Sequence, residues 1–260
     1  MNILETKNLG VTFGGLQAVK QVDMVAREGE ITAVIGPNGA GKTTLFNLIT
    51  GFYKPTTGRI LYAGQDITRR KAHERAGLGL TRTYQNIHLF EELSVVDNVL
   101  VGLHSKTRSG VVAGLLRLPF NAREERKSRE KVMETLTFLG LDGYADYAAG
   151  SLSYGMQKNL EIARALVSDP RLILLDEPAS GLNTNDLRRL SANICAIRDQ
   201  GISVILIEHK MDVVMSISDK ILVLNFGEKI AEGPPEAVRR EPAVVEAYLG
   251  TRHRKEARHA

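Results

Sequence analysis

The sequence predicts an α/β fold built on a mainly parallel β-sheet, and two observations support this fold class. Short apolar runs rich in β-branched residues alternate along the chain with helical stretches. Three of these runs, 31–35, 172–175 and 203–207, are almost continuously hydrophobic. Strands of a parallel sheet show this pattern because helices cover both faces of the sheet. We therefore expect these three runs to form the centre of the core.

Two further regions differ from this pattern. The runs 221–224 and 229–231 flank a short polar turn and predict a hairpin. We also expect an antiparallel β subdomain beside the parallel core. Between about residues 86 and 160, strand signals disappear and charged helical sequence replaces them, most clearly at 121–139. Gly140 and the residues after it should end that helix. We interpret 86–160 as a helical subdomain inserted within one domain that spans residues 1–260.

The composition is that of an ordinary globular protein, with 43% hydrophobic and 25% charged residues. A single cysteine, Cys195, excludes an internal disulfide. No run approaches the roughly 18 apolar residues of a membrane-spanning helix, and the first residues lack the layout of a signal peptide. The net charge of +4 includes a basic tail at 251–260, which we interpret as a flexible, solvated end. A contact with anionic lipid or nucleic acid is the alternative, although no aromatic residues interleave these charges.

A phosphate-binding motif follows the first buried strand and fits the pattern G-x-x-x-x-G-K-[ST]. Glycines let the backbone turn so that its N–H groups converge on an oligophosphate, and the next helix directs its positive end there. We expect Lys42 to reach the β- and γ-phosphates of ATP and Thr43 to bind Mg²⁺. A chance glycine-rich turn is the alternative, but a helix that Gly51 can cap follows directly. The predicted ATP-binding residues of this P-loop NTPase core are Gly36, Pro37, Asn38, Gly39, Ala40, Gly41, Lys42, Thr43 and Thr44.

Two acids stand at the end of the buried run 172–175. Carboxylates are costly to bury, so acids at the tip of such a strand usually have a purpose. Asp176 is placed to hold Mg²⁺ through water, and Glu177 to polarise the water that attacks the γ-phosphate. His209 follows another buried strand and could contact the γ-phosphate and orient Glu177. The alternatives are acids that merely begin a loop and a histidine that is structural or exposed.

The segment Leu152-Ser153-Tyr154-Gly155-Met156-Gln157 runs into an apolar-periodic helix. It resembles the L-S-G-G-Q signature of ABC transporter ATPases, although a Ser N-cap on an ordinary helix is the simpler interpretation. The segments that follow resemble that family in order and spacing over nearly the whole chain. The resemblance implies that two subunits enclose two ATP molecules and that Ser153 and Gly155 complete the ATP site of the opposite subunit.

The family resemblance also assigns roles to individual residues. Phe13 matches the aromatic residue that stacks on adenine, and Gln85 matches the glutamine that contacts Mg²⁺ and signals to the membrane domain. His209 matches the switch histidine. The expected catalytic residues are thus Glu177, His209, Gln85 and Lys42, and the expected Mg²⁺ ligands are Thr43, Gln85 and Asp176.

Three residues depart from the common family pattern. Tyr154 replaces the usual first glycine of the signature, Met156 replaces its glutamine, and Asn183 stands where many relatives have Asp. Tyr154 and Asn183 resemble one subgroup, the ATPases of branched-chain amino-acid importers. Segments such as 44–53 and 231–250 resemble the same subgroup. Met156 is less usual there.

The resemblance implies an ATPase that powers import of leucine, isoleucine and valine at the cytoplasmic face of the membrane. Its expected partners are a second ATP-binding subunit, as a homo- or heterodimer, two transmembrane permeases and, indirectly, a substrate-binding protein, with no nucleic acid. Related systems carry urea, amides or other amino acids, and a sister branch exports lipopolysaccharide. A non-transport ABC protein acting on nucleic acid or ribosomes is the alternative from another class, and a binding-only regulator is a third.

Overall fold

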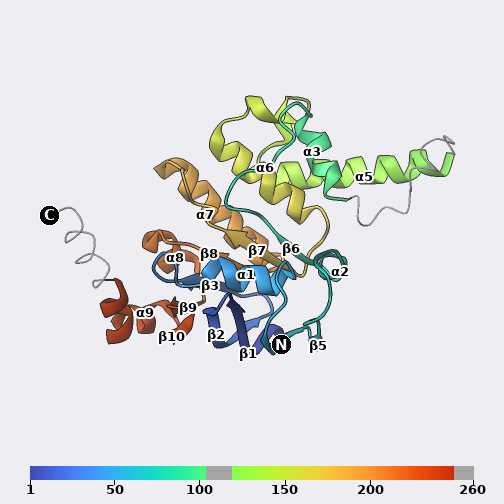
Figure 1. Ribbon diagram of the computed structural model, residues 1–260. Helices are drawn as coiled ribbons and strands as arrows, with labels where there is room; N and C mark the ends of the chain where they lie inside the picture. Colours follow the sequence, from blue (N-terminus) through green and yellow to red (C-terminus); the bar gives the residue numbers. More distant parts are fainter. Residues whose placement is uncertain (104–118, 249–260) are drawn as a thin grey trace.

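The computed structural model describes residues 1–103 and 119–248, so the basic tail predicted at 251–260 lies outside the described residues. Two β-sheets organise the described part of the chain (Figure 1). The larger has six strands in the order β10-β9-β3-β8-β7-β6. Its strands are β3 (Ile31–Ile35), β6 (Leu80–Arg82), β7 (Leu172–Asp176), β8 (Ser203–Ile207), β9 (Lys220–Asn225) and β10 (Glu228–Gly233).

All neighbours in the larger sheet pair in parallel except β9 and β10, which form the predicted antiparallel hairpin. The three continuously hydrophobic runs are its central strands β3, β8 and β7. The smaller sheet is antiparallel, with the order β2-β1-β4-β5. Its strands are β1 (Asn2–Phe13), β2 (Leu16–Arg27), β4 (Thr57–Tyr62) and β5 (Gln65–Asp66). The predicted α/β class, with its parallel core and antiparallel subdomain, is confirmed.

Alternate residues of the parallel strands enter two different hydrophobic cores, because successive side chains of a strand point to opposite faces. On β7, Leu172 and Leu174 join a core with helix α1 (Lys42–Thr50) and the antiparallel sheet. Ile173 and Leu175 join the core on the opposite face. Helices therefore cover one face of the sheet, while α1 lies between the two sheets (Figure 1).

The second core is built largely from helices. Figure 1 shows α3, α5 and α6 gathered on one side of the molecule, away from the antiparallel sheet, as the helical insertion of the expected fold class. Residues 104–118 of the predicted subdomain 86–160 lie outside the described residues. The remaining helices are α2 (Ala72–Gly77), α3 (Val95–Val101), α5 (Pro119–Phe138), α6 (Tyr154–Leu166), α7 (Thr184–Asp199), α8 (Met211–Ile217) and α9 (Pro235–Arg240), with 3-10 turns at Asp142–Tyr144 and Ala149–Ser151 and a helical segment at 242–248.

Local signals explain several helix ends. Gly51 caps α1 in a left-handed conformation, with φ of 81°, and its N–H donates to Leu48 O. Ser153 and Asn183 cap the N-termini of α6 and α7 with their side chains. Within the described ranges, no helix combines the length and the apolar character needed to cross a bilayer.

Candidate active site

The phosphate-binding loop connects β3 to α1 and passes very close to two neighbouring backbones. A Cβ atom added at Gly36 would lie 2.1 Å from the carbonyl oxygen of Leu224, and one at Gly41 would lie 2.5 Å from that of Ala18. Gly41 also has φ of 99°, a conformation that L side chains rarely adopt. Glycine is therefore required at both positions by packing as well as by any ligand.

Hydrogen bonds join this loop to the turn of the β9–β10 hairpin, and that turn is bonded in the same way to β2. The N–H of Gly227 donates to Ala40 O at 3.0 Å, and Gly227 O accepts from the N–H of Lys20 at 2.8 Å. Within the loop, the N–H of Ala40 donates to Pro37 O. The loop thus has a fixed shape that its neighbours in the fold support.

Lys42 is the first residue of α1 and is buried. Its Nζ donates to the carbonyl oxygens of Gly36 at 2.8 Å and Pro37 at 3.0 Å. Burial lowers the pKa of Lys42, and the negative charges of Glu177 and Asp176 oppose that lowering. The charges of the predicted general base Glu177 and the predicted Mg²⁺ ligand Asp176 therefore favour the ammonium form of Lys42.

A cavity of about 620 Å³ opens over this loop. It is lined by loop and helix residues from Asn38 to Thr44, by Gln85 and Glu177, and by residues 16–18 of β2. Phe226, at the hairpin turn, also lines it and was missed in the sequence because nothing marks a turn residue as a cavity wall. The cavity has the backbone donors and the volume suited to a nucleoside triphosphate.

Phe13, predicted to stack on adenine, does not line this cavity. It lies at the end of β1, where its ring packs edge-to-face against Tyr53 with the centroids 5.1 Å apart. The side chain is 43% exposed. The pair of rings presents an aromatic surface just before the β1–β2 turn, next to residues 16–18.

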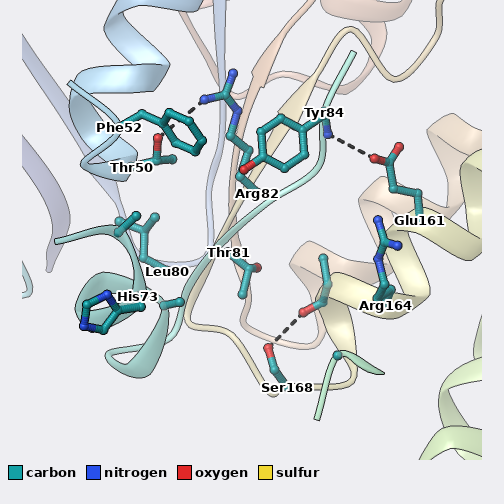
Figure 2. Close-up of a pocket in the computed structure, with 14 residues that line it drawn as sticks. Thr50, Phe52, His73, Leu80, Thr81, Arg82, Tyr84, Glu161, Arg164 and Ser168 are labelled. Carbon is teal, nitrogen blue, oxygen red and sulfur yellow. Dashed lines mark hydrogen bonds between the residues drawn. The ribbon is translucent and has the colours of Figure 1, made fainter. Parts of the chain in front are cut away.

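A second cavity, of about 390 Å³, lies between α1, the edge strand β6 and helix α6 (Figure 2). Phe52 and Tyr84 line it and are 62% and 38% exposed. Glu161 and Arg164 of α6 form its other side (Figure 2). The N–H of Tyr84 donates to the Glu161 carboxylate at 3.1 Å, and burial raises the pKa of Glu161. This cavity adjoins the segment that carries Gln85.

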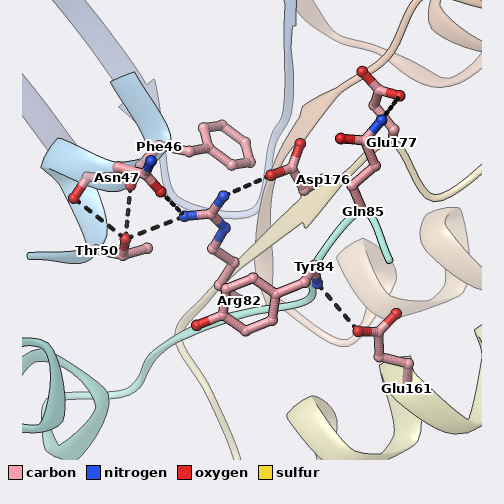
Figure 3. A network of polar contacts seen from close by, with 9 residues as sticks. All are labelled: Phe46, Asn47, Thr50, Arg82, Tyr84, Gln85, Glu161, Asp176 and Glu177. Carbon is pink, nitrogen blue, oxygen red and sulfur yellow. Dashed lines mark hydrogen bonds and ion pairs between the residues drawn. The ribbon is translucent and has the colours of Figure 1, made fainter. Parts of the chain in front are cut away.

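At the end of β7, Asp176 is buried and pairs with Arg82 at 2.6 Å (Figure 3). This contact uses Oδ2, whereas Oδ1 is buried and has no hydrogen-bond partner among the described residues. A buried acceptor without a partner is costly, and hard cations and their ligand waters suit such an oxygen. Asp176 thus offers an oxygen of the kind that Mg²⁺ or its ligand waters contact, and Thr43 lines the cavity.

Glu177 is the meeting point of two other predicted residues. Its Oε2 accepts from Gln85 Nε2 at 2.8 Å and lies 3.6 Å from Nδ1 of His209. Glu177 has φ of 48°, which is unusual for a side-chain-bearing residue, and its N–H donates to Ile207 O. The structure therefore brings together Gln85, Glu177 and His209 at the edge of the nucleotide cavity.

Glu208, which was not predicted from the sequence, supports this cluster through hydrogen bonds to the neighbouring backbone. Its buried carboxylate accepts from the N–H of Ala179 at 2.7 Å and from the N–H groups of His209 and Lys210 at 3.0 and 3.2 Å. The turn that carries His209 and the loop after Glu177 are thus joined through one side chain. A glutamate beside a histidine gives no signal of this role in the sequence.

Ser153 and Gly155, at the start of α6, do not line the nucleotide cavity of their own chain. Gly155 lies against the carboxylate of Asp186, since an added Cβ would be 2.6 Å from its Cγ. Tyr154 packs against Gly181, since a Cβ atom added at Gly181 would lie 2.8 Å from Cε1 of the tyrosine ring. The signature segment therefore packs on the loop that follows Asp176 and Glu177 and on the start of α7, with Ser153 and Tyr154 exposed and Gly155 buried.

Comparison with known sequences shows the family of the chain. The sequence model described as "ABC transporter" matches residues 19–180, which include the loop, Gln85, the start of α6 and both acids. The chain belongs to the ABC transporter ATP-binding family. A second model, described as "Branched-chain amino acid ATP-binding cassette transporter", matches residues 228–254. The chain is thus an ATP-binding cassette with ATPase activity.

Individual relatives of this ABC ATPase agree with the family models. The high-affinity branched-chain amino acid transport ATP-binding protein BraF of Pseudomonas aeruginosa is 45% identical over 249 residues, covering 95% of this chain and 98% of BraF. A crystal structure of the ADP conformation of an ATP-binding cassette of an ABC transporter is 35% identical and covers 96% and 99% of the two chains, with a TM-score of 0.85. A dimeric ATP-binding cassette bound to ADP and Pi is 26% identical, with 89% and 98% coverage and a TM-score of 0.74.

Proposed function

We propose that this ABC ATPase powers import of branched-chain amino acids through partner permeases. The observation that carries the proposal is the similarity to BraF over 95% of the chain. It extends beyond the part shared by ABC transporters in general, because the model for branched-chain amino acid cassettes matches residues 228–254. The cassette would act at the cytoplasmic face of the membrane, indirectly served by a substrate-binding protein.

In the proposed hydrolytic reaction, Glu177 is the general base for the attacking water. Gln85 and His209 hold its carboxylate, as their contacts of 2.8 and 3.6 Å with Oε2 support. Lys42 would release the two loop carbonyls and bind the β- and γ-phosphates of ATP. Phe13, beside Tyr53, would stack on the adenine ring at the mouth of the site.

Mg²⁺ is the second proposed cofactor, held by Thr43, Gln85 and Asp176. When bound, the ion neutralises phosphate charge and orients the β- and γ-phosphates. The unpartnered Oδ1 of Asp176 supports this assignment. Gln85 would contribute from the part of the cavity wall where its side chain contacts Glu177.

We further propose that two ATP-binding subunits enclose the nucleotides. The N-terminus of α6, with Ser153 and Gly155, would complete the ATP site of the opposite subunit, since neither residue lines the cavity of its own chain. Helix N-termini bind anions through free N–H groups and the helix dipole. The dimeric cassette among the solved relatives supports such a pair.

The second cavity (Figure 2) is the proposed docking site for a cytoplasmic segment of a permease. Its exposed aromatic rings, Phe52 and Tyr84, would anchor an apolar side chain, and Arg164 a polar one. Tyr84 directly precedes Gln85, so a permease bound there would contact the segment that holds the catalytic glutamate. Permease binding and ATP hydrolysis would thus be coupled through the adjacent residues Tyr84 and Gln85.

A transport assay tests the cargo. In source cells whose one copy of this chain carries Glu177→Gln, uptake of radiolabelled leucine should fall to background while lysine uptake stays unchanged. Unchanged leucine uptake would reject the cargo assignment. The matched control is Glu236→Gln, the same chemical change on the exposed surface of α9, which should leave both uptakes unchanged.

A second experiment tests the docking site. Phe52→Ala should reduce leucine uptake at least about tenfold, equivalent to ~1.4 kcal/mol of lost binding, because it removes an exposed aromatic anchor that the permease would cover. ATPase activity of the isolated subunit should not change, since Phe52 does not line the nucleotide cavity. Tyr147→Ala serves as the control, because Tyr147 is 57% exposed and lies outside both cavities. Equal loss of uptake in both variants would argue against this docking site.

A further inference from the structure

Arg82 is a buried cation between the two cavities. It ends β6 and lies beside β7, where it is paired in parallel register with Leu174. Its side chain is only 6% exposed. The guanidinium group lies 5.5 Å from the ring centroid of Phe46 and 5.1 Å from that of Tyr84. Cation–π contacts of this kind restrict the position of the guanidinium plane.

Two polar groups of α1 hold the other side of this guanidinium. Nη1 of Arg82 donates to Asn47 Oδ1 at 2.6 Å and to Thr50 Oγ1 at 3.4 Å, while Nη2 donates to Asp176 Oδ2 at 2.6 Å (Figure 3). Arg82 therefore connects the helix that follows the phosphate-binding loop to the acid at the end of β7. A planar guanidinium with several fixed donors is suited to such a bridge.

This bridge has two consequences for Asp176. First, the guanidinium places a positive charge 2.6 Å from a carboxylate that is almost wholly buried, which offsets part of the cost of burying that group. Second, because Oδ2 is occupied, the carboxylate cannot rotate freely, and the orientation of Oδ1 is fixed. Oδ1 is the buried oxygen without a partner among the described residues.

We propose that Arg82 is a positioning residue for Mg²⁺ binding: by holding Oδ2 of Asp176, it directs Oδ1 toward the ion and its ligand waters. The inference rests on the proposed placement of Mg²⁺ at Asp176. Arg82 contacts neither nucleotide nor metal in this scheme and acts only through the carboxylate. Two other roles would leave different signatures, since Arg82 could compete with the ion for Asp176 or could serve only the stability of the fold.

The test measures Mg²⁺-dependent nucleotide binding instead of turnover. Affinity of the full chain for a non-hydrolysable ATP analogue is determined by calorimetry, with excess Mg²⁺ and with a chelator. The dissociation constant in the chelator divided by that in excess Mg²⁺ is called the magnesium gain. In Arg82→Gln this gain should fall at least about tenfold, while affinity in the chelator stays within about threefold of wild type. Arg82→Lys, which keeps the charge but not the planar fork, should recover part of the gain.

Arg75→Gln is the matched control, because the side chain of Arg75 is also buried and donates to the carbonyl oxygens of Leu48 and Ile49 at the end of the same helix. Arg75→Gln should lower the melting temperature of the protein and keep the magnesium gain of the wild type. If Arg82→Gln does not fold, Asn47→Ala loosens Arg82 from its other side and should lower the gain in the same direction.

Each outcome separates the alternatives. A wild-type gain in Arg82→Gln, or in Asn47→Ala where that variant is used, would reduce Arg82 to a structural role and overturn the inference. A larger gain would show competition with the ion and overturn it as well. Absence of any gain in the wild-type chain would instead overturn the placement of Mg²⁺ on which the inference rests.

Discussion

Replacing Glu177 by Gln should stop ATP turnover while leaving ATP binding intact. The amide is nearly isosteric and can still contact Gln85 and His209, but it cannot accept a proton from water. General-base catalysis typically contributes a factor of about 10²–10⁴, so turnover should fall at least about a hundredfold. Because ATP is bound and not hydrolysed, two subunits should remain associated as a dimer that size-exclusion chromatography can detect.

The comparison for this prediction is Glu236→Gln, which should keep wild-type turnover. Glu177→Gln activity within about tenfold of wild type, a barrier change of only ~1.4 kcal/mol, would refute the general-base role. Loss of ATP binding in the same variant would point to a structural role for Glu177, whose left-handed backbone conformation already departs from the usual.

Lys42→Ala should abolish tight nucleotide binding. The lysine is the buried cation of the loop, and its Nζ already lies at the carbonyls of Gly36 and Pro37. We expect the affinity for ATP to fall at least about a hundredfold, or ~2.7 kcal/mol, because the β- and γ-phosphates lose their cationic partner. Fluorescence titration with a labelled ATP analogue measures this directly.

Lys20→Ala separates the specific contact from general charge. Lys20 lines the same cavity, but its Nζ pairs with Glu228 at 3.0 Å, so its removal should change ATP affinity less than about threefold. Equal losses in the two variants would indicate nonspecific attraction to the cavity, and unchanged affinity in Lys42→Ala would contradict the phosphate-binding assignment.

Much of the parallel core could be predicted because its signals are local. Runs 31–35 and 203–207 are buried on both faces, so their hydrophobicity is continuous, and the structure has β3 and β8 with these bounds. The spacing of glycines and lysine in the loop needs no tertiary information. The helix after the loop was predicted to end at Gly51, as it does.

The antiparallel sheet was expected only as a subdomain, and the pairing of its long strands β1 and β2 could not be predicted residue by residue. Pairing of β1 with β2 contains register shifts at several points, including Thr6/Leu9 and Leu9/Val11. Each shift changes which side chains face the core, so the alternation of polar and apolar residues is broken. Asn8 and Gln21, with φ of 48°, lie within these strands.

The supporting residues of the site were missed for a different reason. Arg82 and Asp176 are 94 positions apart and meet only because β6 and β7 become neighbours in the sheet. Glu208 acts through backbone N–H groups, which carry no sequence signal. Phosphate-binding motifs can be recognised because one segment carries them, whereas these contacts require the assembled fold.

The backbone of the phosphate-binding loop is wedged between Leu224 and Ala18 and bonded to the hairpin turn at Gly227. Its conformational entropy is therefore lost during folding, and not when the ligand arrives. In the proposed binding mode, Lys42 would exchange its contacts with two loop carbonyls for contacts with phosphate, while the loop backbone keeps its shape. Preorganisation of this kind would leave more of the binding energy of each nucleotide available for the proposed pairing of two subunits.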